Sequence, residues 1–158
     1  MNRNFFTLIA AATLTLAAAP AFSADPSPLA EGKSLYEKTC ATCHTLDRSL
    51  AKQADKAGWE STIKKMVTNG AKLDESQSGL VLGYLTAKSA FETKCNTCHD
   101  LQRPLTAIKN PDQWQATVQR MATMKPGHLA DADAGAIALY LSLVTPVKPA
   151  APAAPAYK

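Results

Sequence analysis

Apolar residues recur with a helical spacing along most of the chain. Trp59, Ile63, Met66 and Val67 lie at positions i, i+4, i+7 and i+8, which places them on one face of a helix. No segment alternates apolar and polar residues over the length of a strand, so the pattern predicts an all-α protein. The expected helices cover residues 29–43, about 59–67, 74–87, 88–98, about 114–121 and 131–143.

The sequence also contains an internal repeat. At a shift of 55 positions Trp59 matches Trp114, and Met66 matches Met121. The second copy then has one additional residue, so that Gly79 matches Gly135 at a shift of 56. Such self-similarity indicates a duplicated unit. We expect two modules of three helices each, covering residues 25–87 and 88–145.

The sequence between the two modules does not have the composition of a flexible linker. Residues 86–90 contain neither glycine nor proline, so we expect a continuous or nearly continuous helix there. Residues 146–158 are rich in proline and alanine without periodicity, which predicts a disordered tail. This tail is either a tether or docking peptide or a solvated end of the chain.

The first 24 residues have the features of a secretory signal peptide. Arg3 precedes an apolar run over residues 5–19, and small residues follow at 20–24. Cleavage after Ser23 places Ala21 at the −3 position. The alternative is an uncleaved membrane anchor, although the apolar run is short for a membrane span. We therefore expect an exported, periplasmic protein with no stable membrane span after cleavage.

All four cysteines fall in two C-x-x-C-H motifs, at residues 40–44 and 95–99. Two thiols at this spacing form thioethers with the two vinyl groups of one porphyrin, and the adjacent imidazole binds the iron. A C-x-x-C pair alone also suits a redox disulfide or half a zinc site, but neither explains a histidine after each pair. The motifs predict two covalently attached haem c groups, with Cys40, Cys43, Cys95 and Cys98 as attachment residues and His44 and His99 as proximal iron ligands.

The charge of the chain does not indicate a nucleic-acid partner. The formal net charge is +4 and falls to +3 when Arg3 leaves with the signal peptide. The four propionates of two haems would bring the protein close to neutral. The sequence contains no dense lysine and arginine stripe interleaved with aromatic residues.

Three features together resemble the class I c-type cytochromes in a dihaem, two-module form. They are C-x-x-C-H near the end of a first helix, a last helix that carries Tyr-Leu, and a W-x-x-x-[IV]-x-x-M stretch similar to that of small cytochrome domains serving periplasmic dehydrogenases. The resemblance covers almost all of the chain between the signal peptide and the tail. It implies three helices around each haem and a role in electron transfer.

The number of histidines and methionines in the sequence limits which residues can be the distal iron ligands. Only His128 remains after the two proximal histidines, so bis-histidine ligation at both haems is excluded. Met66 is the only methionine of the first module, and Met121 is its equivalent in the second. Met124 and His128 are alternatives to Met121, and a methionine on an apolar helix face also serves as core filler. We expect Met66 and Met121 as distal ligands.

An electron carrier accounts best for these features. Iron bound by histidine and methionine has no free position for a substrate, so we expect a non-enzymatic protein. It would move single electrons between a dehydrogenase or quinol-side donor and a terminal acceptor. The alternative is a cytochrome subunit of, or a small haem enzyme acting as, a periplasmic oxidoreductase of sulfur compounds, amines or peroxide. Such an enzyme needs an open distal site, and His128 is the acid–base group available for it.

Overall fold

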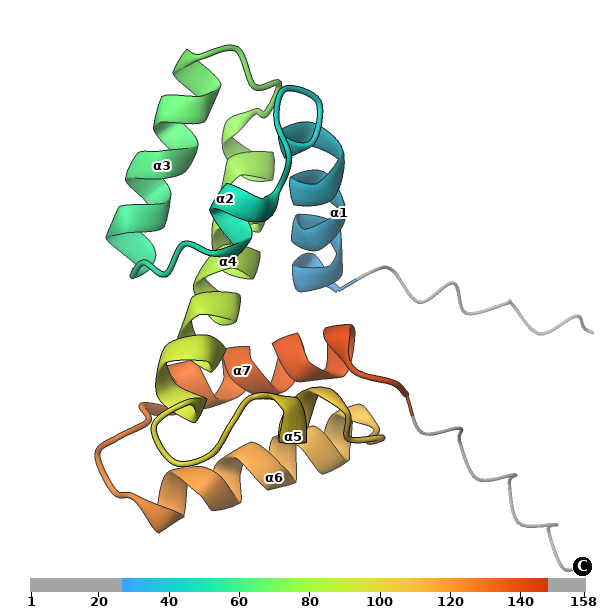
Figure 1. Ribbon diagram of the computed structural model, residues 1–158, viewed down its shortest axis with the longest axis vertical. Helices are drawn as coiled ribbons and strands as arrows, with labels where there is room; N and C mark the ends of the chain where they lie inside the picture. Colours follow the sequence, from blue (N-terminus) through green and yellow to red (C-terminus); the bar gives the residue numbers. More distant parts are fainter. Residues whose placement is uncertain (1–26, 148–158) are drawn as a thin grey trace, which may run out of the picture.

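The computed structural model describes residues 27–147, and these residues form helices without any strand (Figure 1). The prediction of an all-α protein is therefore confirmed. The predicted signal peptide and most of the predicted tail lie outside the described residues. Among the described helices, none combines the length and the apolar character needed to cross a membrane. The helices are α1 (Pro28–Cys40), α2 (Asp47–Leu50), α3 (Lys56–Thr68), α4 (Glu75–Cys95), α5 (Gln102–Leu105), α6 (Pro111–Met124) and α7 (Asp131–Val144).

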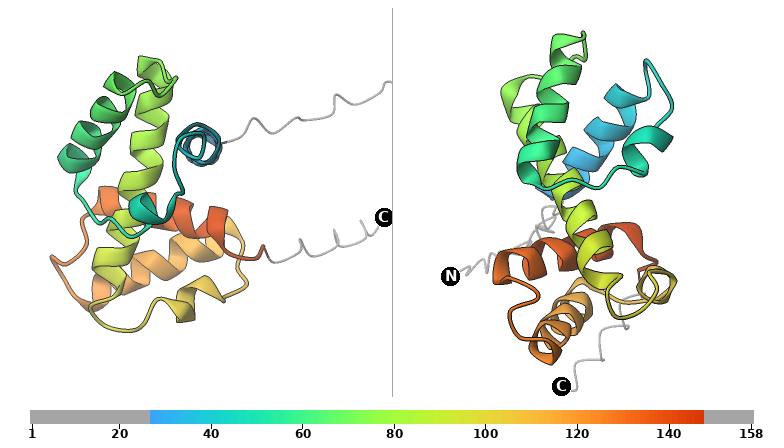
Figure 2. Two further views of the ribbon diagram at one scale, coloured as in Figure 1. Left: turned by 45° about the horizontal axis from the view of Figure 1, so that its top comes forward. Right: turned by 60° about the vertical axis from the view of Figure 1, so that its left-hand side comes forward.

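Helix α4 is the central element of the fold. It begins with a capping box, in which Asp74 accepts from the Gln77 backbone N–H and Gln77 accepts from that of Asp74. It then runs without a break through the expected junction at residues 87 and 88. Helices α1 and α3 pack on α4 in the first half of the chain, and α7 packs on it in the second (Figures 1 and 2). One helix therefore belongs to both halves.

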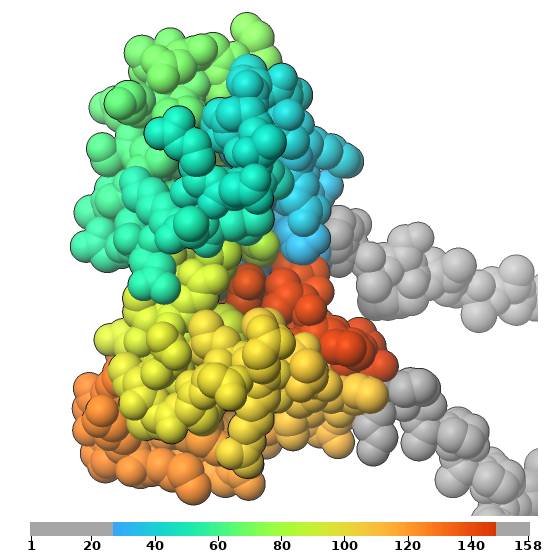
Figure 3. All heavy atoms as spheres, in the orientation of Figure 1, coloured from blue at the N-terminus to red at the C-terminus, as the bar shows by residue number. Residues whose placement is uncertain are grey.

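The crossing of α1 and α4 is close. A Cβ atom added to Gly32 would lie 2.2 Å from the Leu80 carbonyl oxygen, so only glycine fits there. One turn later, Tyr36 packs against Tyr84 with ring centroids 5.6 Å apart. The aromatic cluster continues into the second half, where Tyr140 contacts both Tyr84 and Phe91. Figure 3 shows the result, with the red atoms of α7 between blue α1 and the yellow segments of the second half.

Several contacts occur once in each half. The Trp59 indole N–H donates to the Ser89 hydroxyl at 2.8 Å, and the Trp114 indole N–H donates to the Thr145 hydroxyl at 2.9 Å. Both tryptophans are buried. Asp55 and Asn110 cap α3 and α6 in the same way, by accepting the backbone N–H three residues on. The internal similarity of the sequence is thus accompanied by similar local contacts.

Candidate haem sites

The first C-x-x-C-H motif lies where α1 ends. Cys40 is the last residue of the helix and is half-buried, whereas Cys43 and His44 are exposed in the turn after it. The Thr42 hydroxyl donates to the Thr39 carbonyl at 2.7 Å and holds this turn. The His44 Nδ1 donates to the Thr45 carbonyl at 2.8 Å, which leaves Nε2 as the nitrogen able to bind a metal.

A cavity of about 490 Å³ opens beside this motif. Cys40, His44 and Met66 all line it, so the structure brings together three of the residues predicted for the first site. Met66 lies on α3, nearly two turns beyond Trp59, which places both on the face toward the cavity. The remaining lining residues are Tyr36, Arg48, Ser49, Lys52, Trp59, Thr62, Ile63, Lys65, Asn69, Ala71, Leu73, Val81 and Leu85.

The chemistry of the lining fits a haem. Its charged members are Arg48, Lys52 and Lys65, all cations, and they suit the two carboxylates of a haem edge. Aromatic and aliphatic side chains form most of the rest, as an apolar porphyrin requires. Arg48 is exposed and lines the cavity, in keeping with a propionate partner.

Sequence reasoning missed Lys52 as a lining residue. Its Nζ donates to the Thr62 hydroxyl at 2.6 Å and lies 5.3 Å from the centre of the Trp59 ring, a cation–π distance. Nothing in the local sequence distinguishes this lysine from the other surface lysines. The repeat offers only an approximate signal, because Lys109 lies over Trp114 in the second half at a shift of 57 rather than 55.

The second motif has a similar local structure. Cys95 is the last residue of α4, Cys98 is exposed, and the His99 Nδ1 donates to the Asp100 carbonyl at 2.9 Å. As in the first motif, the imidazole Nε2 is left available. Met121 lies on α6 and is 38% exposed, whereas Met124 ends that helix and is 70% exposed.

His128, the other distal candidate, is held against the second motif. Gly127 has a positive φ of 78°, which turns the chain after α6 back toward α4. The His128 Nε2 then lies 2.9 Å from the Lys94 carbonyl, to which it donates, and 3.0 Å from the Thr97 hydroxyl. In the first half, Lys72 lies 56 positions before His128 and has no imidazole to make this contact.

The two other interpretations of a C-x-x-C pair are a redox disulfide and half a zinc site. All four thiols are free, and the described residues contain no group of three histidine, cysteine or acidic side chains placed to hold a metal. Burial raises the pKa of the Cys40 thiol and raises that of Cys95 to about 11. Redox-active C-x-x-C pairs instead have a thiol of lowered pKa.

Residues 27–78 match a family model described as cytochrome c oxidase, cbb3-type, subunit III. The match contains the first C-x-x-C-H motif but not the second, and it supports a c-type cytochrome domain in this part of the chain. Domains of this class bind haem c covalently and transfer electrons. Comparison with curated proteins and with solved structures gives no match.

Proposed function

We propose that the chain is a periplasmic dihaem c-type cytochrome that carries single electrons between redox protein partners. The observation that carries this proposal is the first cavity, because Cys40 and His44 of the first motif and Met66 of helix α3 all line it. The family match over the same residues agrees with it. The modules would cover residues 25–87 and 88–145.

Each group of side chains has a distinct role in the first site. Cys40 and Cys43 would attach the haem, and the His44 Nε2 and the Met66 sulfur would bind its iron. The cations Arg48 and Lys52 would bind its carboxylates. The apolar lining residues exclude water from the iron, which favours a high potential. Haem iron supplies one-electron exchange between its ferrous and ferric states.

A second haem is supported by the local contacts of the second motif. The hydrogen bond from His99 Nδ1 and the Trp114–Thr145 contact repeat those of the first half. We propose Met121 as its distal ligand, with Met124 and His128 as alternatives.

The location and the partners are inferred from the sequence. A signal peptide within residues 1–24, cleaved after Ser23, would export the chain. Its electron donor would be a dehydrogenase or a quinol-side protein, and its partner on the other side a terminal acceptor. Full ligation by histidine and methionine favours a carrier over the alternative, a subunit of an oxidoreductase or a small haem enzyme.

Mass spectrometry of the exported protein tests the proposal. The chain should begin at Ala24 and carry two haem masses that survive acid–acetone extraction. One haem or none would overturn the dihaem proposal. Ferrous protein should not bind carbon monoxide, whereas Met66→Ala should open the first haem alone and Met121→Ala the second alone. Ready binding of carbon monoxide by the wild-type protein would favour the enzyme alternative.

A further inference from the structure

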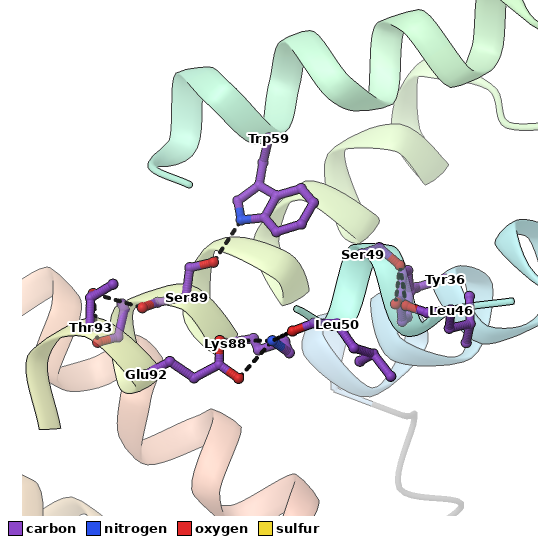
Figure 4. A network of polar contacts seen from close by, with 10 residues as sticks. Tyr36, Leu46, Ser49, Leu50, Trp59, Lys88, Ser89, Glu92 and Thr93 are labelled. Atoms are coloured by element: carbon purple, nitrogen blue, oxygen red, sulfur yellow. Dashed lines mark hydrogen bonds and ion pairs between the residues drawn. The ribbon is translucent and has the colours of Figure 1, made fainter. Parts of the chain in front are cut away.

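Two side chains from beyond the predicted module boundary reach back to helix α2 and to Trp59, which contribute to the lining of the first cavity. The Lys88 Nζ donates to the Leu50 carbonyl at 2.7 Å, and the Ser89 hydroxyl accepts the Trp59 indole N–H at 2.8 Å (Figure 4). Lys88 is 4% exposed and Ser89 is 3% exposed. Both residues lie in the part of α4 that the repeat assigns to the second module.

Lys88 fixes helix α2, which forms part of the cavity lining. Leu50 is the last residue of α2, where backbone carbonyls have no partner within the helix. An ammonium group satisfies such a carbonyl and is favoured at this end of a helix. Arg48 and Ser49, in the same short helix, both line the cavity. The Ser49 hydroxyl also contacts the Tyr36 hydroxyl at 2.7 Å, which ties α2 to α1.

Ser89 fixes the orientation of Trp59, the largest apolar side chain of the cavity lining. An indole has one N–H donor and no acceptor, so a buried tryptophan needs one well-placed acceptor. Trp59 is 1% exposed and finds that acceptor on Ser89. Thr93 in turn donates to the Ser89 carbonyl at 2.7 Å within α4 (Figure 4).

Lys33, the repeat equivalent of Lys88, has no such role. Lys33 pairs with Glu37, and Lys88 pairs with Glu92, each at 2.6 Å and four residues apart on a helix. The side chains of the first pair are 31% and 47% exposed, and those of the second are 5% and 20% exposed. The second pair is buried because it also faces α2 of the first half, through Leu50. Burial of a charged group requires such polar partners.

The structure assigns Lys88 and Ser89 as positioning residues of the first haem site, acting through helix α2 and Trp59. This assignment rests on the proposed function of that site. The first haem site is therefore supported by residues of both halves of the chain. Loss of either contact should let water closer to the first iron and lower its potential, while the second iron is unchanged.

Four variants of the full holoprotein test the assignment. Ser89→Ala removes the acceptor of Trp59, and its matched control Thr145→Ala removes the equivalent acceptor of Trp114. Lys88→Met keeps the length of the side chain without its charge, and its matched control is Lys33→Met. Each haem is followed separately during a redox titration by its haem methyl proton resonances. These are assigned through contacts with Cys40 or with Cys95.

We expect Ser89→Ala and Lys88→Met to lower the midpoint potential of the first haem alone. Thr145→Ala should lower the midpoint potential of the second haem alone. Lys33→Met should change neither potential. An unchanged first haem in Ser89→Ala or in Lys88→Met overturns the assignment of that residue. If Lys88→Met fails to fold, the Ser89 and Thr145 variants decide whether this part of α4 positions the first haem site. Mass spectrometry of each protein comes first, since fewer than two haems in the wild type would instead overturn the proposed function.

Discussion

The two halves of the molecule contain similar motifs, but the acceptor of the buried tryptophan has different surroundings in each half. In the second half, Trp114 finds its acceptor in Thr145 at the end of α7. In the first half, Trp59 finds its acceptor in Ser89, inside a helix that continues for six more residues. The contact thus occurs in both halves, but its surroundings differ. The last part of α4 contacts elements of both halves, whereas α7 has no such second role in the described chain.

The prediction with the largest expected effect removes the cysteines of one proposed haem attachment at a time. Cys95→Ala with Cys98→Ala should lose helix in the second half, since a bound haem supplies most of the core of a small module. It should also disturb the first haem, because Lys88 and Ser89 lie on the same part of α4.

The matched variant, Cys40→Ala with Cys43→Ala, should affect mainly the first half. Far-ultraviolet circular dichroism and the methyl resonances of the remaining haem measure both effects. Equal disturbance of the remaining haem in the two double variants would contradict the predicted asymmetry.

A smaller but still large effect is expected at the helix crossings. Gly32→Ala places a Cβ atom against the backbone of Leu80 and should destabilise the protein by about 1–3 kcal/mol through overpacking. Ala87, the residue 55 positions later, is buried and already has a Cβ atom. Ala87→Gly should therefore cost only about 1 kcal/mol, the helix propensity of glycine. Urea unfolding compares the two, and tolerance of Gly32→Ala would show that α1 can shift on α4.

The helix N-termini provide a third contrast. Asp74 caps α4, whereas Ala130 at the equivalent position of α7 makes no side-chain cap. Asp74→Ala should lower the free energy of unfolding by roughly 1 kcal/mol, and Ala130→Ser should raise it by a similar amount. Thermal unfolding of the two single variants measures the change, and a gain of stability in both would contradict it.

The smallest effect is expected only at alkaline pH. Burial, with a smaller contribution from Glu92, raises the pKa of Tyr140 to about 12, against about 10 for an unfolded tyrosine. The folded state then binds the phenolic proton more tightly. Its contribution to stability is complete below about pH 10 and is lost as the pH rises toward about 12.

Tyr140→Phe should reduce this alkaline loss, as measured by the urea midpoint at about pH 8 and about pH 11, on either side of the unfolded pKa. Burial also raises the pKa of Tyr84, the repeat equivalent of Tyr140, so Tyr84→Phe should act in the same direction. An unchanged alkaline loss in both variants would show that other groups govern it.

Much of the fold could be predicted because its long helices have clear apolar periodicity. The expected helix over residues 59–67 lies within α3, and the expected continuity at residues 86–90 is that of α4. The expected end of the first helix at residue 43 was wrong. The helix ends at Cys40, and the Thr42 hydroxyl after it donates a hydrogen bond to the Thr39 carbonyl. Helices α2 and α5 were not predicted, since four residues are too few to show a period.

The candidate site was predictable only in part. The motif and the repeat led to Cys40, His44 and Met66, which the structure brings to one cavity, although their binding to a haem stays a prediction. The role of Lys88 could not be predicted. It resembles Lys33 in its sequence surroundings, and its partner Leu50 is 38 residues away.

Helix α4 also sets the angle between the two halves. Each residue added to an α-helix advances the chain beyond it by about 1.5 Å and rotates it by roughly 100°, since a turn contains about 3.6 residues. One residue inserted between Ala87 and Lys88 would swing the second half around the helix axis and carry Lys88 away from Leu50. A relative of this chain with a longer shared helix would therefore present its two motifs in different directions, even if every other residue were the same.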